Sequence, residues 1–249
     1  LVALRVLMLD AIPAMLSCED RPALQALFLS NNCFEHITRL LQNSQLYLSS
    51  SRAGGEARNE VPLQPADRDG LQQVWDGRSD AIAVHAIRVL TSIMSNSPSA
   101  KEVFKERIGY THLYEVLRSQ GQPTQRLLQE LLNMAVEGDH SSFPVRHIRN
   151  EQPLLILLAW LPALMSHELQ VFLSGQLRRL CEASLPNRLT CVKAGMVGCL
   201  LSALASEPAL PTASSDHLLE LLRALGGLSI RPGELRQLLR LLRRERGRG

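Results

Sequence analysis

Residues 97–140 hold one complete helical unit with clear start and stop signals. Ser97-Pro98 is typical of a helix start, because a serine oxygen accepts hydrogen bonds from free N–H groups and proline suits the first helical position. Short, medium and long helices are predicted over 98–107, 110–119 and 123–137, and Gly138 is placed to close the last in the left-handed conformation. This order is the layout of an armadillo-type repeat, whose apolar faces become buried when neighbouring repeats stack on it.

The same order of helices recurs on both sides of this unit. Further helices are predicted over 1–15, 20–32, 34–47, 81–94, 151–165, 167–183, 186–193, 196–205, 215–228 and 234–244. Pro162 is expected to strain or end the helix that contains it. The corners between short and medium helices are filled by Asn31-Asn32, Gly109 and Gly195, which adopt positive φ angles more readily than other residues. Successive medium helices lie about 43 residues apart, inside the roughly 40–47 of armadillo and HEAT repeats.

Leucine and alanine dominate the apolar positions. Hydrophobic residues make up 45% of the chain and aromatic residues only 4%, which favours stacked helices over a β-sandwich. Apolar stripes are formed by Leu127, Leu128, Leu131, Leu132 and Ala135 on one long helix and by Leu4, Leu7, Met8, Ala11 and Met15 on the first helix. Gly226-Gly227 interrupts a leucine-rich helix and predicts a kink or a packing contact. We therefore predict an all-α, armadillo/HEAT-like α-solenoid of about five partial or complete helical repeats.

A polar segment, residues 49–80, interrupts these repeats. Its Ser, Gly, Pro and charged residues bury too little apolar surface to order the segment, so a flexible, disordered insertion is predicted. Its one apolar cluster, 71–75, either docks back onto the solenoid or serves as a linear binding motif. The predicted organisation is armadillo-like repeats over 1–48, the insertion over 49–80, continued repeats over 81–244, and a linker or tail over 245–249.

The chain is expected to be a cytosolic segment of a longer protein, since Leu1 already lies in a helical pattern without an initiator methionine. The five cysteines form no CxxC pair and are odd in number, which is typical of free thiols in a reducing compartment. The most apolar run, 154–164, is shorter than the ~20 residues that span a bilayer.

Motifs for catalysis, cofactor binding and metal binding are absent from the sequence. It has no GxSxG, no GxxxxGK[ST], and no GxGxxG after a strand. Asp139-His140 and His147 come close enough in sequence to suggest a metal site, but the fixed spacing of three ligands that a catalytic zinc site usually needs, such as HExxH, is absent. We therefore expect no enzyme, no catalytic, cofactor-binding or metal-binding residue, and no small-molecule substrate.

Contact with other proteins is the activity that we expect, through polar positions on two long helices. The candidate contact residues are Arg126, Gln129, Glu130, Asn133, Arg178, Arg179 and Glu182; the alternative is an ordinary solvated face. Nuclear-import armadillo proteins pair a tryptophan with an asparagine four residues later, but Gln129 stands four residues before Asn133, which argues against that role. The arginines from Arg236 to Arg248 either bind phosphate or an acidic membrane, or form the polar end of the repeat array.

Three segments resemble the armadillo-like region of the neurobeachin-like BEACH protein family. They are SIMSNSPSAKEVFKERIGYTHLYEVL, RLLQELLNMAVEGDH and ELQVFLSGQLRRLCEASLPNRLTCVKAGMVGCLLSAL, and the resemblance is strongest over 82–140 and 167–205. It implies a large cytoplasmic scaffold that acts in vesicle trafficking and granule biogenesis, partly as a peripheral protein on endomembranes such as endoplasmic reticulum or vesicles. Membrane association is then expected to be indirect, through other domains of the full-length protein.

Three functions stay open at this point. The first is a non-enzymatic segment that recruits protein partners within a trafficking scaffold. The second is a nucleic-acid-binding solenoid, which the low aromatic content and the net charge of only +3 argue against. The third is a purely structural spacer between domains.

Overall fold

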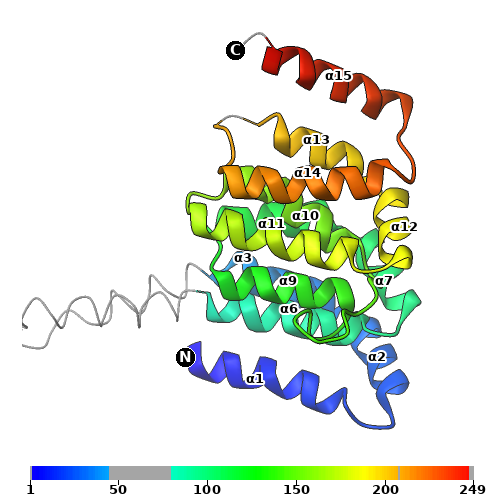
Figure 1. Ribbon diagram of the computed structural model, residues 1–249. Helices are drawn as coiled ribbons and strands as arrows, with labels where there is room; N and C mark the ends of the chain where they lie inside the picture. The colour runs from blue at the N-terminus through cyan, green and yellow to red at the C-terminus, as the bar shows by residue number, and fades with distance from the viewer. Residues whose placement is uncertain (1, 45–79, 207, 247–249) are drawn as a thin grey trace, which may run out of the picture. The chain divides into compact units, whose positions relative to one another are not determined.

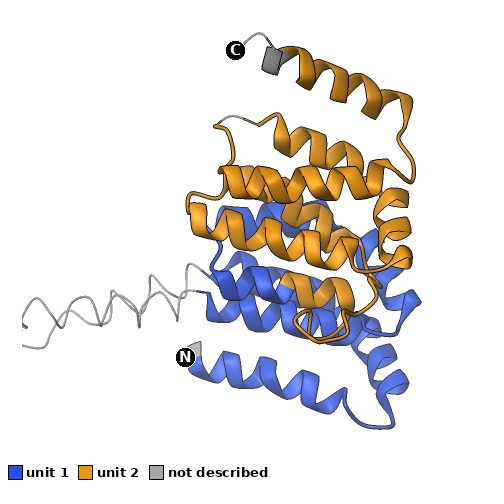
Figure 2. Cartoon of the chain, in the orientation of Figure 1, with its two compact units in different colours: residues 1–130 blue, residues 131–249 orange. Residues whose placement is uncertain are grey.

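The computed structural model describes residues 2–44, 80–206 and 208–246, and the regular elements among them are helices (Figure 1). The chain divides within helix α9 into two compact units, residues 1–130 and 131–249 (Figure 2). Unit 1 holds α1 (Val2–Met15), α2 (Arg21–Ser30), α3 (Cys33–Gln42), α6 (Ala81–Met94), α7 (Pro98–Arg107), α8 (Tyr110–Ser119) and the start of α9 (Gln125–Val136). Unit 2 holds the rest of α9, α10 (Gln152–Trp160), the 3₁₀ helix η1 (Leu161–Ala163), α11 (His167–Glu182), α12 (Leu185–Lys193), α13 (Met196–Leu204), α14 (Thr212–Gly226) and α15 (Pro232–Arg246).

The capping role predicted for Ser97 is confirmed, and two further helices begin with capping serines for which no cap was predicted. The hydroxyl of Ser97 accepts a hydrogen bond from Ala100 N at 3.2 Å, and the hydroxyls of Ser166 and Ser184 cap α11 and α12 in the same way. The helices 81–94, 98–107 and 110–119 have the predicted bounds. Pro162 ends its helix as predicted, since α10 tightens into η1 there. The predicted insertion and its 71–75 cluster lie, except for Asp80, outside the described residues.

The corners between short and medium helices adopt the predicted positive φ angles, in the left-handed helical region at Asn32 and Gly195 and with an extended ψ angle at Gly109. The φ angles are 53° at Asn32, 79° at Gly109 and 80° at Gly195, and each of these residues is the N-cap of the helix that follows. A β-branched or bulky residue in this conformation is strained, so asparagine or glycine is required at the turn. The recurrence of one corner confirms that the helical unit repeats.

The end of α9 differs from the prediction. Glu137, and not Gly138, adopts the positive φ angle, at 54°. A Cβ atom at position 138 would lie 2.7 Å from Nη1 of Arg146, so the end of that exposed side chain would have to shift. Gly138 therefore provides space for the Arg146 guanidinium, which lies against the helix end.

The predicted apolar face of α1 is also wrong. Leu4, Leu7, Met8 and Met15 are all more than half exposed, whereas Leu9 and Leu16 on the opposite side are buried where α1 packs along α6. Both sides of α1 are apolar, so a 3.6-residue period alone does not determine which of them packs on α6. The exposed apolar side of α1 remains uncovered in the described part of the chain.

The C-terminal helices need two further corrections. Gly226 and Gly227 do not kink a helix, because α14 ends there with Gly227 as its C-cap. The predicted short helix over 234–244 is longer, since α15 begins at Pro232 and extends to Arg246. Proline at the first turn of α15 explains the earlier start, because its missing N–H group needs no partner there.

The core of unit 1 surrounds α6, which packs against α1, α3 and α7. The buried residues of α6 include Ile87, Leu90 and Ile93. Beside them an aromatic cluster joins Phe34, Phe104 and Tyr110, with ring centroids 5.1 and 5.0 Å apart in edge-to-face geometry. Such pairs stabilise a core beyond the area that they bury.

The C-terminal end of α6 is tied to α2 by a buried side chain. The amide of Gln25 donates to the carbonyl oxygens of Ile93 at 2.8 Å and Ser95 at 3.1 Å. Helix ends leave carbonyl groups without an intrahelical partner, and Gln25 satisfies one of them. In unit 2 the long helices α11 and α14 lie side by side, with Leu173, Leu177 and Leu221 buried between the packed helices.

Candidate protein-contact surface

Two of the candidate contact residues on α9, Arg126 and Glu130, are held by ion pairs within unit 1. Glu130 accepts a hydrogen bond at 2.6 Å from Nη2 of Arg88 on α6. Arg126 lies 3.7 Å from the nearly buried carboxylate of Asp80, which also accepts a hydrogen bond from the Thr124 hydroxyl. The third candidate, Gln129, is half-buried on the same helix.

A row of alternating charges crosses the long helices of unit 1. Asp10 on α1 lies 2.5 Å from Nδ1 of His85 and 3.8 Å from Arg88, and Arg88 reaches on to Glu130. Because each cation in the row lies beside a carboxylate, the row presents little net charge. The row links side chains of α1, α6 and α9, and a partner that binds to these side chains must replace the existing pairs.

Three candidate residues on α11 border one hollow in unit 2. The hollow has a volume of about 390 Å³ and is lined by Gly175, Arg178, Arg179, Glu182, Ala183 and His217. Nε of Arg178 lies 3.2 Å from Glu182, and its Nη2 lies 2.7 Å from Glu220 on α14. Arg178 therefore connects two long helices at the rim and presents a fork of N–H donors next to two carboxylates.

The opposite wall of this hollow comes from α14. His217 approaches α11 closely at Gly175, where a Cβ atom would lie 3.4 Å from its ring. Nδ1 of His217 lies 3.1 Å from the hydroxyl of Ser174. The hollow thus combines an imidazole, two guanidinium groups and a carboxylate, which suits hydrogen bonding to a polar segment of another protein.

Two of the candidates, Asn133 and Arg179, hold the loop over 138–150. Oδ1 of Asn133 accepts a hydrogen bond from His140 N at 3.0 Å and lies 2.8 Å from His140 Nδ1. Since an amide oxygen only accepts, Nδ1 of His140 carries the proton in this contact. Nη2 of Arg179 donates to the His140 carbonyl oxygen at 2.5 Å.

Asn187 is a further residue that fixes this loop, and no role was predicted for it from the sequence. Its side chain is buried at the start of α12, where Oδ1 accepts from Ile148 N at 3.0 Å. Its amide nitrogen donates to the carbonyl oxygens of Leu180 at 2.7 Å and Arg146 at 3.2 Å. The only sequence signal is its position three residues after the capping Ser184. The loop held in this way exposes Phe143 by 95%.

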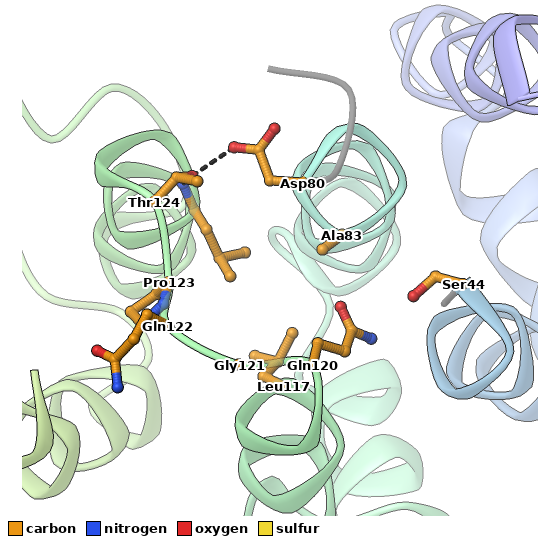
Figure 3. Close-up of a pocket in the computed structure, with 10 residues that line it drawn as sticks. Ser44, Asp80, Ala83, Leu117, Gln120, Gly121, Gln122, Pro123 and Thr124 are labelled. Carbon is orange, nitrogen blue, oxygen red and sulfur yellow. Dashed lines mark hydrogen bonds between the residues drawn. The ribbon is translucent and has the colours of Figure 1, made fainter. Parts of the chain in front are cut away.

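A small cavity in unit 1 lies among the ends of α3, α6, α8 and α9 (Figure 3). Figure 3 shows the hydroxyl of Ser44 and the amide of Gln120 pointing toward one another, and Thr124 reaching Asp80. Gln120 donates to the Leu41 carbonyl oxygen at 2.7 Å. The volume of this cavity, about 130 Å³, is below the roughly 300–1,000 Å³ of pockets that bind organic ligands.

The described residues offer neither a membrane span nor a metal cluster. None of their helices combines the length and the apolar character needed to cross a bilayer. They contain no group of three or more His, Cys, Asp or Glu side chains placed to hold a metal ion. In the Asp139-His140 pair that the sequence suggested, His140 bonds Asn133, and hydrogen bonds from Ser141 lower the pKa of Asp139.

Two of the cysteine thiols are strongly perturbed. Contact with the Cys191 thiol, together with burial, raises the pKa of Cys181 well above its usual range. Burial, and then the charge of Glu35, raise the pKa of Cys33 to about 11. Thiolate is the reactive form of cysteine, so both side chains are expected to be inert near neutral pH.

The raised pKa values of these thiols predict that the fold loses stability at alkaline pH. A thiol whose folded-state pKa lies above the unfolded value of 9.0 stays protonated in the folded chain when the unfolded chain already ionises. Its contribution to stability is therefore complete below pH 9 and is lost as the pH rises through the folded-state pKa. The melting temperature is therefore expected to fall between about pH 9 and pH 11, and Cys181→Ala should reduce the fall. At pH 8 a thiol reagent should modify the exposed Cys18 first. Modification of Cys181 at the same rate in the folded chain would contradict the prediction.

The repeated helices and their shared corners define a helical-repeat protein. The family model described as the neurobeachin alpha solenoid region matches residues 72–248, and the chain belongs to this family. The predicted all-α solenoid class and the BEACH-family resemblance are thereby confirmed. BEACH domain-containing protein B of Arabidopsis thaliana is 30% identical over 230 residues, which cover 89% of this chain and 8% of that relative. No solved structure matches the chain.

Proposed function

We propose that the chain is a non-enzymatic protein-interaction segment of a large BEACH-family scaffold. The observation that carries this proposal is the hollow between α11 and α14, where Arg178, Arg179, Glu182 and His217 present donors and acceptors along one face. A helical repeat array offers such extended faces to protein partners. The proposed partners are other proteins, with neither a small-molecule substrate nor a nucleic acid.

The cellular setting of the proposal comes from the family. Vesicle trafficking and granule biogenesis, on the cytoplasmic side of endomembranes, are the processes that the BEACH resemblance implies for the parent scaffold. Within the family we propose the neurobeachin-like protein 2 branch, on the arginine- and leucine-rich ending and the Ser/Gly-rich segment between 49 and 80.

A charge exchange at the rim of the hollow tests the proposal while keeping an ion pair between α11 and α14, although it removes the Arg178–Glu182 pair. The double variant Arg178→Glu/Glu220→Arg keeps opposite charges at the two positions, which lie 2.7 Å apart, but reverses the charge pattern that a partner meets. Proteins captured reproducibly by the chain from cytosol, and identified by mass spectrometry, should be lost with this variant. The matched control is Arg107→Glu/Glu35→Arg, which exchanges an ion pair between α7 and α3 outside the candidate contact residues and should retain them.

Three outcomes would refute the proposal. Equal capture by both double variants would exclude the hollow as the contact surface. Reproducible absence of any captured protein would indicate a spacer. Capture that disappears after nuclease treatment, with RNA affinity falling steeply as salt rises, would indicate a nucleic-acid-binding solenoid.

A further inference from the structure

Helix α15 packs on α13 with only part of its apolar surface. Leu238 and Leu241 are half-buried, whereas Leu235, Leu239 and Leu242 are 45%, 49% and 53% exposed. The exposed leucines are spaced by four and three residues, so they form one stripe along the helix. Leu228 and Ile230, just before the helix, are exposed as well.

A second stripe of the same spacing consists of arginines. Arg236, Arg240 and Arg243 are exposed and lie next to the leucine stripe, on the side away from the packed residues. Within the described part of the chain these three side chains have no carboxylate partner. The nearby carboxylate of Glu234 accepts a hydrogen bond from Arg231 N at 2.7 Å.

We propose that this face of α15 binds the surface of an anionic membrane directly. A helix with leucines along one side, arginines beside them and a strongly polar remainder lies in the plane of a bilayer interface. The leucines enter the acyl boundary, and the guanidinium forks bind lipid phosphates in bidentate geometry at the rim. In a bilayer the apolar acyl layer lies directly beneath the anionic phosphate layer, so the leucine stripe and the neighbouring arginine stripe can contact both layers at once.

This inference goes beyond the proposed protein contacts and differs from the indirect membrane association expected from the sequence. It is independent of the hollow in unit 2, because it uses only α15 and the residues just before it. Because Arg236, Arg240 and Arg243 have no carboxylate partner among the described residues, they favour a phosphate-bearing surface over an uncharged helix, which would contact the leucines and leave the three cations without a partner.

Sedimentation with vesicles tests the proposal on the 249-residue chain. The chain should bind phosphatidylcholine vesicles that contain 30% phosphatidylserine and should not bind pure phosphatidylcholine. The variant Arg236→Gln/Arg240→Gln/Arg243→Gln should lower partitioning on the order of 100-fold, as expected if each basic residue contributes about fivefold. The variant Leu235→Ser/Leu239→Ser/Leu242→Ser should abolish binding, with the circular dichroism spectrum unchanged.

The chain supplies a matched control in α1. The variant Leu4→Ser/Leu7→Ser/Met8→Ser removes three exposed apolar side chains from a helix whose single arginine, Arg5, is half-buried, and it should leave vesicle binding unchanged. The Arg178→Glu/Glu220→Arg variant should also bind normally, which separates this proposal from the function proposed for the hollow. Absence of binding to anionic vesicles, or equal loss with the α1 variant, would overturn the proposal. So would self-association that depends on Leu235, Leu239 and Leu242 in a chain that does not bind vesicles.

Discussion

Phe104→Ala is expected to lower the free energy of unfolding by about 3–5 kcal/mol. The Phe104 side chain is fully buried and lies between Phe34 and Tyr110, with ring centroids 5.1 and 5.0 Å away. Removing the ring leaves a cavity and ends both edge-to-face contacts, each worth about 0.5–1.5 kcal/mol beyond area burial. Chemical denaturation followed by circular dichroism measures the change.

Phe143→Ala is the matched control for this prediction. It is the same chemical change at a side chain that is 95% exposed, where a stability change within about 0.5 kcal/mol is expected. If the two variants lost similar stability, the aromatic cluster would not be the core of unit 1. Phe104→Leu should recover much of the loss, because leucine refills part of the cavity.

Asn187→Leu is expected to lower the free energy of unfolding by about 3–5 kcal/mol, although the leucine side chain has a volume similar to that of asparagine. The substitution leaves Ile148 N and the carbonyl oxygens of Leu180 and Arg146 without the partner that they have in the native fold. Each buried polar group without a hydrogen bond costs about 1–3 kcal/mol. Because Asn187 fixes the loop over 138–150, trypsin should also cleave at Arg146 and Arg149 much faster than in the unchanged chain.

Lys193→Leu serves as the control on the same helix. Its side chain is exposed at the end of α12, so the change from polar to apolar should leave both the melting temperature and the cleavage of the loop almost unaltered. Rapid loop cleavage in Asn187→Leu without a loss of stability would show that the loop opens locally. A loss of stability without faster cleavage would mean that Asn187 acts only inside α12.

The positions of the helices were predictable because the residues that start and end them act locally. Ser97, Gly109 and Gly195 act through capping and backbone conformation, which depend on a few neighbouring residues. The buried stripe on α9 was predictable for a similar reason, since Leu128, Leu131 and Ala135 alternate with polar residues and are fully buried. A strong 3.6-residue period with one polar side determines which side faces the core.

The remaining features depend on contacts between distant residues. The stripe on α1 was misassigned because both of its sides are apolar, and only the position of α6 decides which one is covered. The roles of Asn133 and Arg179 were not predictable either, because both side chains bond to His140, on a loop whose path the sequence does not specify. Asn187 satisfies three backbone groups, and two of them lie about 40 positions earlier in the chain.

The small cavity of unit 1 has a consequence for how the repeats tolerate added sequence. Ser44 and Asp80 line the same cavity, so the described residues on either side of positions 45–79 lie close together. When the two ends of a flexible connection are already adjacent, the entropy of closing it grows only with the logarithm of its length, and each doubling costs about 0.6 kcal/mol. The array can therefore gain or lose many residues between these two positions while the register of the flanking helices stays the same.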